Sequence, residues 1–119
     1  MPAQNHVLKN RLSQSSELNL TVNGRKSGRS ITNPVWFVLD DDTLYLLPVH
    51  GSDTQWYKNA LANPSIRIEA KDSNATLEAV PISDPIRVSS VVEKFRRKYG
   101  ARDVKKYYSK LDVAVLAQT

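Results

Sequence analysis

The sequence has no cysteine and only two histidines among its 119 residues. The absence of cysteine excludes a disulfide framework, a Cys-ligated zinc site, an iron–sulfur cluster and a thiol nucleophile. Two histidines are too few for a His-rich metal site, and no nucleophile triad is recognisable, so we predict no metal site. If the protein is an enzyme, we therefore expect a bound cofactor to carry the chemistry.

Long hydrophobic runs are also absent. No apolar segment approaches the ~18 residues of a membrane-spanning helix, and the N-terminus lacks the apolar core of a signal peptide. We therefore expect a cytoplasmic protein with a single domain over residues 1–119. Its 17 Lys and Arg against 12 Asp and Glu give a net charge of +5, which favours an anionic partner. Composition leaves open a nucleic acid, peripheral contact with an anionic membrane face, or a phosphorylated small molecule.

Apolar periodicity divides the chain into a strand-rich first two thirds, a helical segment and a closing strand. Residues 1–15 include a short stretch of helical spacing, which predicts an N-terminal docking helix. About six short strands are predicted from alternating or continuously apolar segments, at residues 18–22, 34–39, 43–49, 66–70, 76–82 and 113–117.

Capping patterns indicate where further helices begin. Ser52 followed by Gln55 is a capping-box pattern, which predicts a helix over 52–63. Asp84 followed by proline is a helix start, and a helical segment is predicted over 84–110. Short strands with interspersed helices predict an α+β fold, in which a mostly antiparallel sheet curls into a small barrel flanked by short helices.

The turn after the first predicted strand is rich in glycine and positive charge, because it reads Asn-Gly-Arg-Lys-Ser-Gly-Arg over residues 23–29. Glycine permits the tight backbone in which amide N–H groups converge on an anion, and Arg and Lys side chains match phosphate oxygens. The spacing is neither that of a Walker loop nor that of a dinucleotide fingerprint. Two interpretations stay open from these residues alone: a phosphate-binding turn, and a solvated basic hairpin tip.

A second candidate site lies at residues 48–51, where the third predicted strand leads into a helix that carries Trp56. A strand end, a glycine and a helix N-terminus place N–H groups and an aromatic wall where a planar ligand fits. The alternatives are a structural, hydrogen-bonded role for His50 and a core role for Trp36 and Trp56.

The later part of the helical segment, residues 94–110, contains eight cations: Lys94, Arg96, Arg97, Lys98, Arg102, Lys105, Lys106 and Lys110. One interpretation is an electrostatic footprint for nucleic acid, and the other is a solvated basic face that steers an anionic ligand. The aromatic residues here have core-type helical spacing, and no strand interleaves aromatics with cations as base stacking requires. We therefore rank nucleic acid as the least favoured partner.

Four ordered segments resemble the deazaflavin-dependent nitroreductase and quinone reductase family. They read LTVNGRKSGR at 20–29, NPVWFVLD at 33–40, LYLLPVHG at 44–51, and WYKN followed by NPSIRI within 56–68. The resemblance implies a split β-barrel related to that of the flavin-binding pyridoxamine-phosphate oxidases. It also implies binding of a reduced 8-hydroxy-5-deazaflavin coenzyme (F420), with flavin mononucleotide (FMN) as the alternative.

The resemblance further implies which residues contact the coenzyme. Those implied to hold its phosphate are Arg25, Lys26 and Ser27, with Arg29 as a helper. Those implied to line its ring are Pro34, Val35, Trp36, Pro48, Val49, His50, Gly51 and Trp56. No catalytic group is assigned; the candidate catalytic residues are Tyr107, Tyr108 and His50, and a proton would come from solvent or a tyrosine.

One departure bears on the ligand. Members of the family commonly continue the turn as Gly-Arg-Pro-Arg, whereas this chain has Ile31 in place of the second arginine, which predicts weaker phosphate contact or a different ligand. The expected activity is hydride transfer to a flat, electron-poor acceptor such as a quinone, a nitroaromatic or an enone. The alternative is a carrier without turnover that holds flavin, haem or deazaflavin. A monomer and a homodimer are both compatible with the chain.

Overall fold

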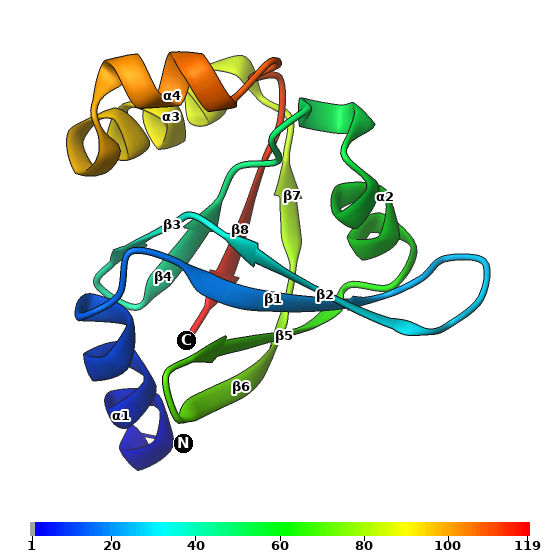
Figure 1. Ribbon diagram of the computed structural model, residues 1–119, viewed down its shortest axis with the longest axis vertical. Helices are drawn as coiled ribbons and strands as arrows, with labels where there is room; N and C mark the ends of the chain where they lie inside the picture. Colours follow the sequence, from blue (N-terminus) through cyan, green and yellow to red (C-terminus); the bar gives the residue numbers. More distant parts are fainter. Residues whose placement is uncertain (1) are drawn as a thin grey trace.

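Two antiparallel sheets of four strands each form the centre of the computed structural model, which describes residues 2–119 (Figure 1). One sheet has the order β2 (Ser30–Val35), β1 (Leu18–Asn23), β5 (Ser65–Ala70), β6 (Ser73–Glu78). The other has the order β3 (Phe37–Asp40), β4 (Thr43–Leu46), β8 (Ala114–Gln118), β7 (Val80–Ile82). The helices are α1 (Pro2–Ser13), α2 (Gln55–Ala62), α3 (Pro85–Tyr99) and α4 (Ala101–Tyr107), with a short 3-10 helix η1 (Gly51–Asp53). The predicted α+β class and split-barrel arrangement are confirmed; Met1, at the start of the predicted docking helix over 1–15, lies outside the described residues.

Residues 2–119 form eight strands, whereas the hydrophobic pattern predicts about six. Trp36 alone separates β2, which pairs with β1, from β3, which pairs with β4 in the other sheet. Ala79 separates β6 from β7 in the same way. The hydrophobic pattern continues through both crossings because the two sheets share one interior, so alternation does not mark where the chain changes sheet.

The space between the sheets is filled by alternate side chains of the strands. Leu20 of β1 lies opposite Ile68 of β5, and both are almost completely buried in one cluster with Leu44 of β4. Helix α1 contacts β6, β5 and β3, and adds Leu8 and Leu12 to this cluster. Burial of each such leucine contributes about 2 kcal/mol, so packing rather than helix propensity holds α1 in place.

Helices α3 and α4 pack with outward-facing side chains of the second sheet, forming a layer above the barrel (Figure 1). Helix α3 begins where the sequence indicates, since the Asp84 side chain accepts a hydrogen bond of 3.0 Å from the backbone N–H of Arg87. The predicted helical segment extends to residue 110, but α4 ends at Tyr107, because Tyr108 has an extended backbone. That early end places Tyr107 and Tyr108 at the edge of the helical layer.

The predicted capping box at Ser52 is wrong. Helix α2 begins at Gln55 with Thr54 as its N-cap residue, and a separate turn, η1, precedes it. The Ser52 backbone N–H and hydroxyl instead donate to the carboxylate of Asp112, at 2.9 and 2.6 Å. A charged acceptor binds these donors more strongly than the neutral groups of a capping box.

Candidate functional site

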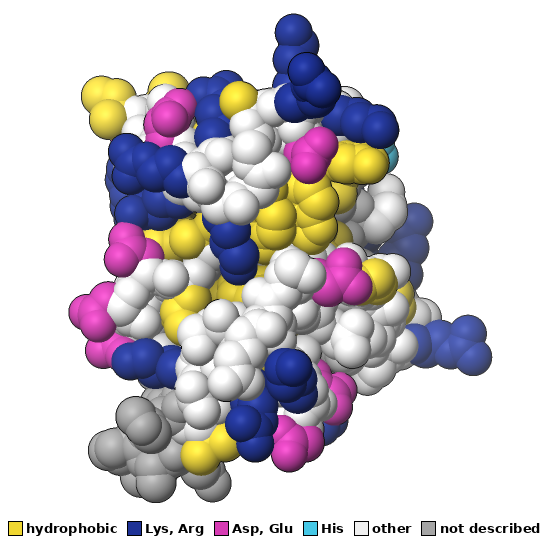
Figure 2. All heavy atoms as spheres, turned by 60° about the vertical axis from the view of Figure 1, so that its left-hand side comes forward, with side chains coloured by type: hydrophobic (Ala, Val, Ile, Leu, Met, Phe, Trp, Pro, Cys, Tyr) yellow, Lys and Arg dark blue, Asp and Glu magenta, His cyan; other side chains and the backbone are white. Residues whose placement is uncertain are grey.

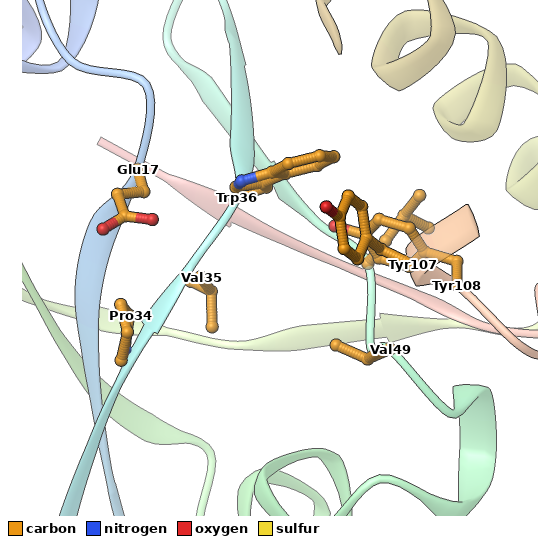
Figure 3. A pocket seen from close by; sticks show the side chains of 8 residues that line it. Glu17, Pro34, Val35, Trp36, Val49, Tyr107 and Tyr108 are labelled. Carbon is orange, nitrogen blue, oxygen red and sulfur yellow. The ribbon is translucent and has the colours of Figure 1, made fainter. Parts of the chain in front are cut away.

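A half-open cavity of about 380 Å³ lies where β2 passes into β3. Its lining consists of Glu17, Pro34, Val35, Trp36, Leu47, Val49, Tyr107 and Tyr108 (Figure 3). Apart from Glu17, these side chains are apolar or aromatic. Figure 2 shows hydrophobic side chains gathered in a band below the helical layer, with Lys and Arg side chains around it. A concave, mostly apolar space of this size suits a flat aromatic molecule.

Trp36 is held in this cavity by aromatic neighbours. Its ring stacks on Tyr99 with centroids 4.2 Å apart and planes 7° from parallel, and Tyr107 meets it edge-on at 5.5 Å. The Tyr99 hydroxyl accepts from the backbone N–H of Phe37 at 3.1 Å, and its oxygen lies 2.6 Å from the carbonyl oxygen of Ser16. Burial raises the pKa of Tyr99 to about 12, so this hydroxyl stays protonated and keeps its bonds. The orientation of the indole is therefore fixed by the surrounding chain.

Two tyrosines at the end of α4 form the opposite wall. Tyr107 is half exposed, whereas Tyr108 is only 7% exposed. Burial raises the pKa of Tyr108 above its ordinary value of 10.0, which keeps its hydroxyl neutral. That hydroxyl has no hydrogen-bond partner among the described residues, and Figure 3 shows the tyrosine side chains directed toward Trp36. A neutral O–H donor thus remains available to a molecule in the cavity.

The loop after β4 lies beside the cavity and is tied to the segment before β8. Ser109 donates its backbone N–H to the Val49 carbonyl at 2.9 Å, and His50 Nδ1 lies 2.8 Å from the Ser109 hydroxyl oxygen. Gly51 has φ of 58°, and a Cβ there would lie 2.1 Å from Asp112 Oδ1. Of the predicted ring-lining residues in this loop, Val49 lines the cavity, while Pro48, His50 and Gly51 are its neighbours in the chain. His50 takes part in holding the loop.

The basic turn joins β1 to β2 and extends beyond the barrel (Figure 1). Arg25 is anchored to α2, because its guanidinium donates to Asn59 Oδ1 at 2.7 Å and to Gln55 Oε1 at 2.9 Å. Both acceptors are uncharged amides, so the positive charge of Arg25 is not neutralised. Lys26 and Arg29 form no salt bridge with any described residue. Three uncompensated cations therefore meet at this turn.

Most backbone amides of the turn are already used inside the chain. Gly28 N–H donates to the Gly24 carbonyl, Gly24 N–H to the Arg29 carbonyl, and Arg29 N–H to the Ser27 hydroxyl oxygen. The backbone N–H of Arg25 donates to Asn59. An anion at the turn would thus meet mainly the cationic side chains and the hydroxyl proton of Ser27, rather than a ring of converging amides.

Strand β2 connects the turn to the cavity and is open along its length. In the β1–β2 register, Ile31, Asn33 and Val35 lie opposite Val22, Leu20 and Leu18 and so share the face that β1 buries. On β2 this face is not covered: Ile31 is 40% exposed, and Asn33 is exposed as well. An uninterrupted, accessible strand face therefore leads from Val35 at the cavity to Arg29 at the turn.

Trp56 lies elsewhere. It is 6% exposed, belongs to the cluster between the sheets and is not among the cavity-lining residues. Its indole Nε1 is buried without a hydrogen-bond partner in the described chain. The structure thus gathers Pro34, Val35, Trp36, Val49 and both tyrosines around one cavity, places the four residues of the turn at the far end of β2, and puts Trp56 in the interior.

Two of the lining residues, Glu17 and Leu47, are not predicted from the sequence. Glu17 directly precedes β1, and its position beside Trp36 depends on the crossing of β2 into β3, which no local pattern reveals. The anchoring of Arg25 by Asn59 is likewise a long-range contact. The only sequence signal for this contact is the presence of two amide side chains, Gln55 and Asn59, near the start of α2.

Neither a cluster of metal-ligating side chains nor a membrane-spanning helix is found in the described part of the chain. Within residues 7–119, where the structure describes the side chains, no three His, Asp or Glu side chains gather closely enough to hold a metal ion. None of the helices in that range combines the length and the apolar character needed to cross a bilayer.

The fold and the cavity together place the chain among split-barrel proteins. Residues 9–117 match the family described as "uncharacterized protein conserved in bacteria" (DUF2255), and the chain belongs to that family. Among solved structures it is similar to an F420-H2 dependent reductase, FDR-A, at 18% identity and a TM-score of 0.68, over 87% of this chain and 94% of that one.

Other solved structures share the same fold. HutZ, described as a heme storage protein from Vibrio cholerae, is 16% identical with a TM-score of 0.70, over 97% of this chain and 89% of that one. A protein described as a domain-swapped dimer is 17% identical with a TM-score of 0.69, over 99% of this chain and all of that one. At these identities the likeness shows the fold alone.

Proposed function

We propose that this protein is an oxidoreductase that binds a reduced 8-hydroxy-5-deazaflavin coenzyme and uses it to reduce a flat, electron-poor acceptor such as a quinone, a nitroaromatic or an activated enone. The observation that carries the proposal is the placement of an aromatic cavity and a tri-cationic turn at the two ends of β2. From Pro34 to Arg29 the strand rises about 16 Å at ~3.3 Å per residue. A planar ring joined to a phosphate by a flexible chain matches that separation.

The residues present fit such a group. Lys26, Arg29 and the Ser27 hydroxyl are available to phosphate oxygens, and Arg25 is held in place by α2 with its charge intact. Trp36, Pro34 and Val35 would contact the ring. When bound, the reduced coenzyme supplies a hydride equivalent. FMN has the same combination of flat ring and phosphate and is the alternative ligand.

The chain's own contribution is orientation, exclusion of water and one hydrogen bond. Trp36 is fixed by its stack on Tyr99, so its exposed surface offers a preformed wall for flat molecules. The neutral hydroxyl of Tyr108 would donate to a carbonyl or nitro oxygen of the acceptor, where negative charge develops during reduction. Tyr107, half exposed at the rim, covers this position from solvent.

A direct test mixes the purified protein with reduced F420 and menadione under anaerobic conditions and follows the visible absorbance of the coenzyme. The expected result is saturable binding of the coenzyme and oxidation that depends on both protein and acceptor. The same titration with FMN compares the two ligands. Absence of both binding and protein-dependent oxidation would overturn the proposal.

A carrier without turnover is the second candidate. It is favoured by the lack of a His side chain among the cavity-lining residues of the described chain. Tight binding of a flavin or deazaflavin without acceptor-dependent oxidation would select this function. Haem is the less favoured cargo, since no His or Met side chain lines the cavity in the described chain, and burial raises the pKa of Tyr108, which disfavours the phenolate that would ligate iron.

A further inference from the structure

Among the residues that line the cavity, Glu17 alone carries a carboxyl group, and it is exposed to solvent. It forms no salt bridge or hydrogen bond with the described part of the chain, unlike Asp40, which pairs with Lys94 at 2.5 Å, and Asp72, which pairs with Arg11 at 2.7 Å. Figure 3 shows the Glu17 carboxylate at one side of the cavity, across from Val49 and the two tyrosines. An unpaired carboxylate thus faces a space that is otherwise apolar.

Two lysines contact aromatic residues around the cavity, and neither forms a salt bridge with this carboxylate. Lys98 donates to the Phe37 carbonyl at 2.8 Å and lies over the Phe37 ring, and Lys106 lies 5.2 Å from the centre of the Tyr107 ring. Neither lysine lines the cavity. The field of Glu17 does reach the aromatic stack, where it adds to the burial that raises the pKa of Tyr99.

Glu17 and the basic turn lie at opposite ends of the same strand. Glu17 directly precedes β1, and Gly24 directly follows it. Seven residue steps at ~3.3 Å correspond to about 23 Å. The site is therefore polarised along its length, with one unpaired negative charge at the cavity and three unpaired positive charges at the turn.

We propose that Glu17 sets the charge selectivity of the cavity, so that it accepts flat aromatic molecules that are cationic or donate N–H or O–H hydrogen bonds, and disfavours those with an anionic group. In the proposed reaction, on which this inference rests for its acceptor, neutral and cationic nitroaromatics or quinones are then better acceptors than carboxylated or sulfonated ones. An anionic tail of a ligand is directed to the turn instead.

Three nitroaromatic probes of nearly equal shape test this selectivity: 4-nitrobenzylammonium, 4-nitrobenzyl alcohol and 4-nitrobenzoate. Their Kd values are measured without coenzyme by quenching of tryptophan fluorescence, because Trp36 lines the cavity. The proteins compared are the unsubstituted chain, Glu17→Gln, and Glu78→Gln, which removes an exposed carboxylate on β6. Thermal unfolding of each variant checks that the fold is retained.

We expect the unsubstituted chain to bind the cationic probe more tightly than the anionic one. In Glu17→Gln the ratio of the two Kd values shifts about fivefold toward the anion, as loss of an exposed charge implies, while the Kd of the alcohol changes less than twofold. Glu78→Gln leaves the ratio unchanged. The same ratio in all three proteins, or no quenching by any probe, overturns the inference.

Turnover of the three probes with reduced F420 separates this inference from the proposed function. Charge-dependent binding without turnover overturns the reductase proposal and leaves the selectivity of Glu17 standing. Turnover with a ratio that is insensitive to Glu17→Gln overturns the selectivity alone.

Discussion

Trp36 and Tyr99 stack with their ring centroids 4.2 Å apart and their planes 7° from parallel, although they come from the β2–β3 crossing and the end of α3. The Tyr99 hydroxyl extends this contact to the backbone of Phe37 and Ser16. The Trp36 wall of the cavity is therefore connected to the end of α3, to the start of β3 and to the segment before β1.

Tyr99→Phe tests the value of that hydroxyl. The stack stays, but the buried N–H of Phe37 loses its acceptor, so we expect the free energy of unfolding in urea to fall by about 1–2 kcal/mol. Tyr107→Phe is the matched control, since the Tyr107 hydroxyl has no hydrogen-bond partner among the described residues, and it should change the value by less than about 0.5 kcal/mol. Equal losses in the two variants would contradict the interpretation.

Tyr108→Phe tests the proposed hydrogen bond to the acceptor. We expect kcat to fall about ten- to a hundredfold, as for loss of a donor to developing negative charge, with the coenzyme Kd changed less than twofold. Because burial raises the pKa of Tyr108 above 10.0, its hydroxyl stays protonated between pH 7 and 10 and kcat should not decline there through this residue. A variant with full kcat would show that Tyr108 only shapes the cavity.

The double substitution Lys26→Gln with Arg29→Gln tests the turn as a phosphate site. FMN and riboflavin carry the same ring with and without a phosphate, so the turn should affect only the first. We expect the Kd of FMN to rise about five- to tenfold and that of riboflavin to stay within twofold. Lys105→Gln with Lys106→Gln removes two charges from α4 and serves as the control. An equal loss for both ligands would show that the turn does not act through the phosphate, and an equal FMN loss in the control would assign the effect to general electrostatics.

Gly51→Ala tests how closely the loop approaches Asp112. At a φ of 58° an alanine is strained by about 1–2 kcal/mol, and its Cβ would also lie 2.1 Å from Asp112 Oδ1, so the total loss in free energy of unfolding should exceed that strain. Gly28→Ala supplies the comparison, since Gly28 has a φ of 73° but no atom within 4 Å of an added Cβ. It should show the strain alone. Equal losses would mean that the loop moves away from Asp112 without cost.

Asp112 should also make stability depend on pH. Its hydrogen bonds from Ser52 hold its pKa below the ordinary value of 3.8. A depressed pKa in the folded state means that this stabilisation is present above that ordinary value and is lost as pH falls through the folded pKa. We expect Asp112→Asn to be less stable than the unsubstituted chain at pH 6 and to lose less stability between pH 5 and 3, measured by urea unfolding. Asp103→Asn, on the exposed side of α4, is the control.

Many strands and helices can be predicted from the sequence, because the interactions that define them are between residues close together in the chain. The alternation of Leu18, Leu20 and Val22 defines β1, and Asp84 with its following proline starts α3. The capping box predicted at Ser52 is wrong because a carboxylate distant in sequence, Asp112, binds the Ser52 donors more strongly than a local partner would.

The candidate site is less readable from sequence because it forms at a crossing. Glu17 and Trp36 line one cavity only because β2 leaves its sheet at Trp36, and that event leaves no trace in the hydrophobic pattern. The residues of the turn are adjacent in sequence and stand out by composition. What composition does not show is that Asn59 and Gln55 orient Arg25 without cancelling its charge.

The single residue between β2 and β3 gives the cavity a mechanical property. Trp36 is the point at which the chain leaves one sheet for the other, and the surrounding walls come from β2, from the loop that follows β4 and from the end of α4. A molecule bound there contacts β2, the loop after β4 and the end of α4 at once, and so links these elements non-covalently. Ligand occupancy should therefore slow amide exchange in strands of both sheets together, with a gain in stability set by RT ln(1 + [L]/Kd).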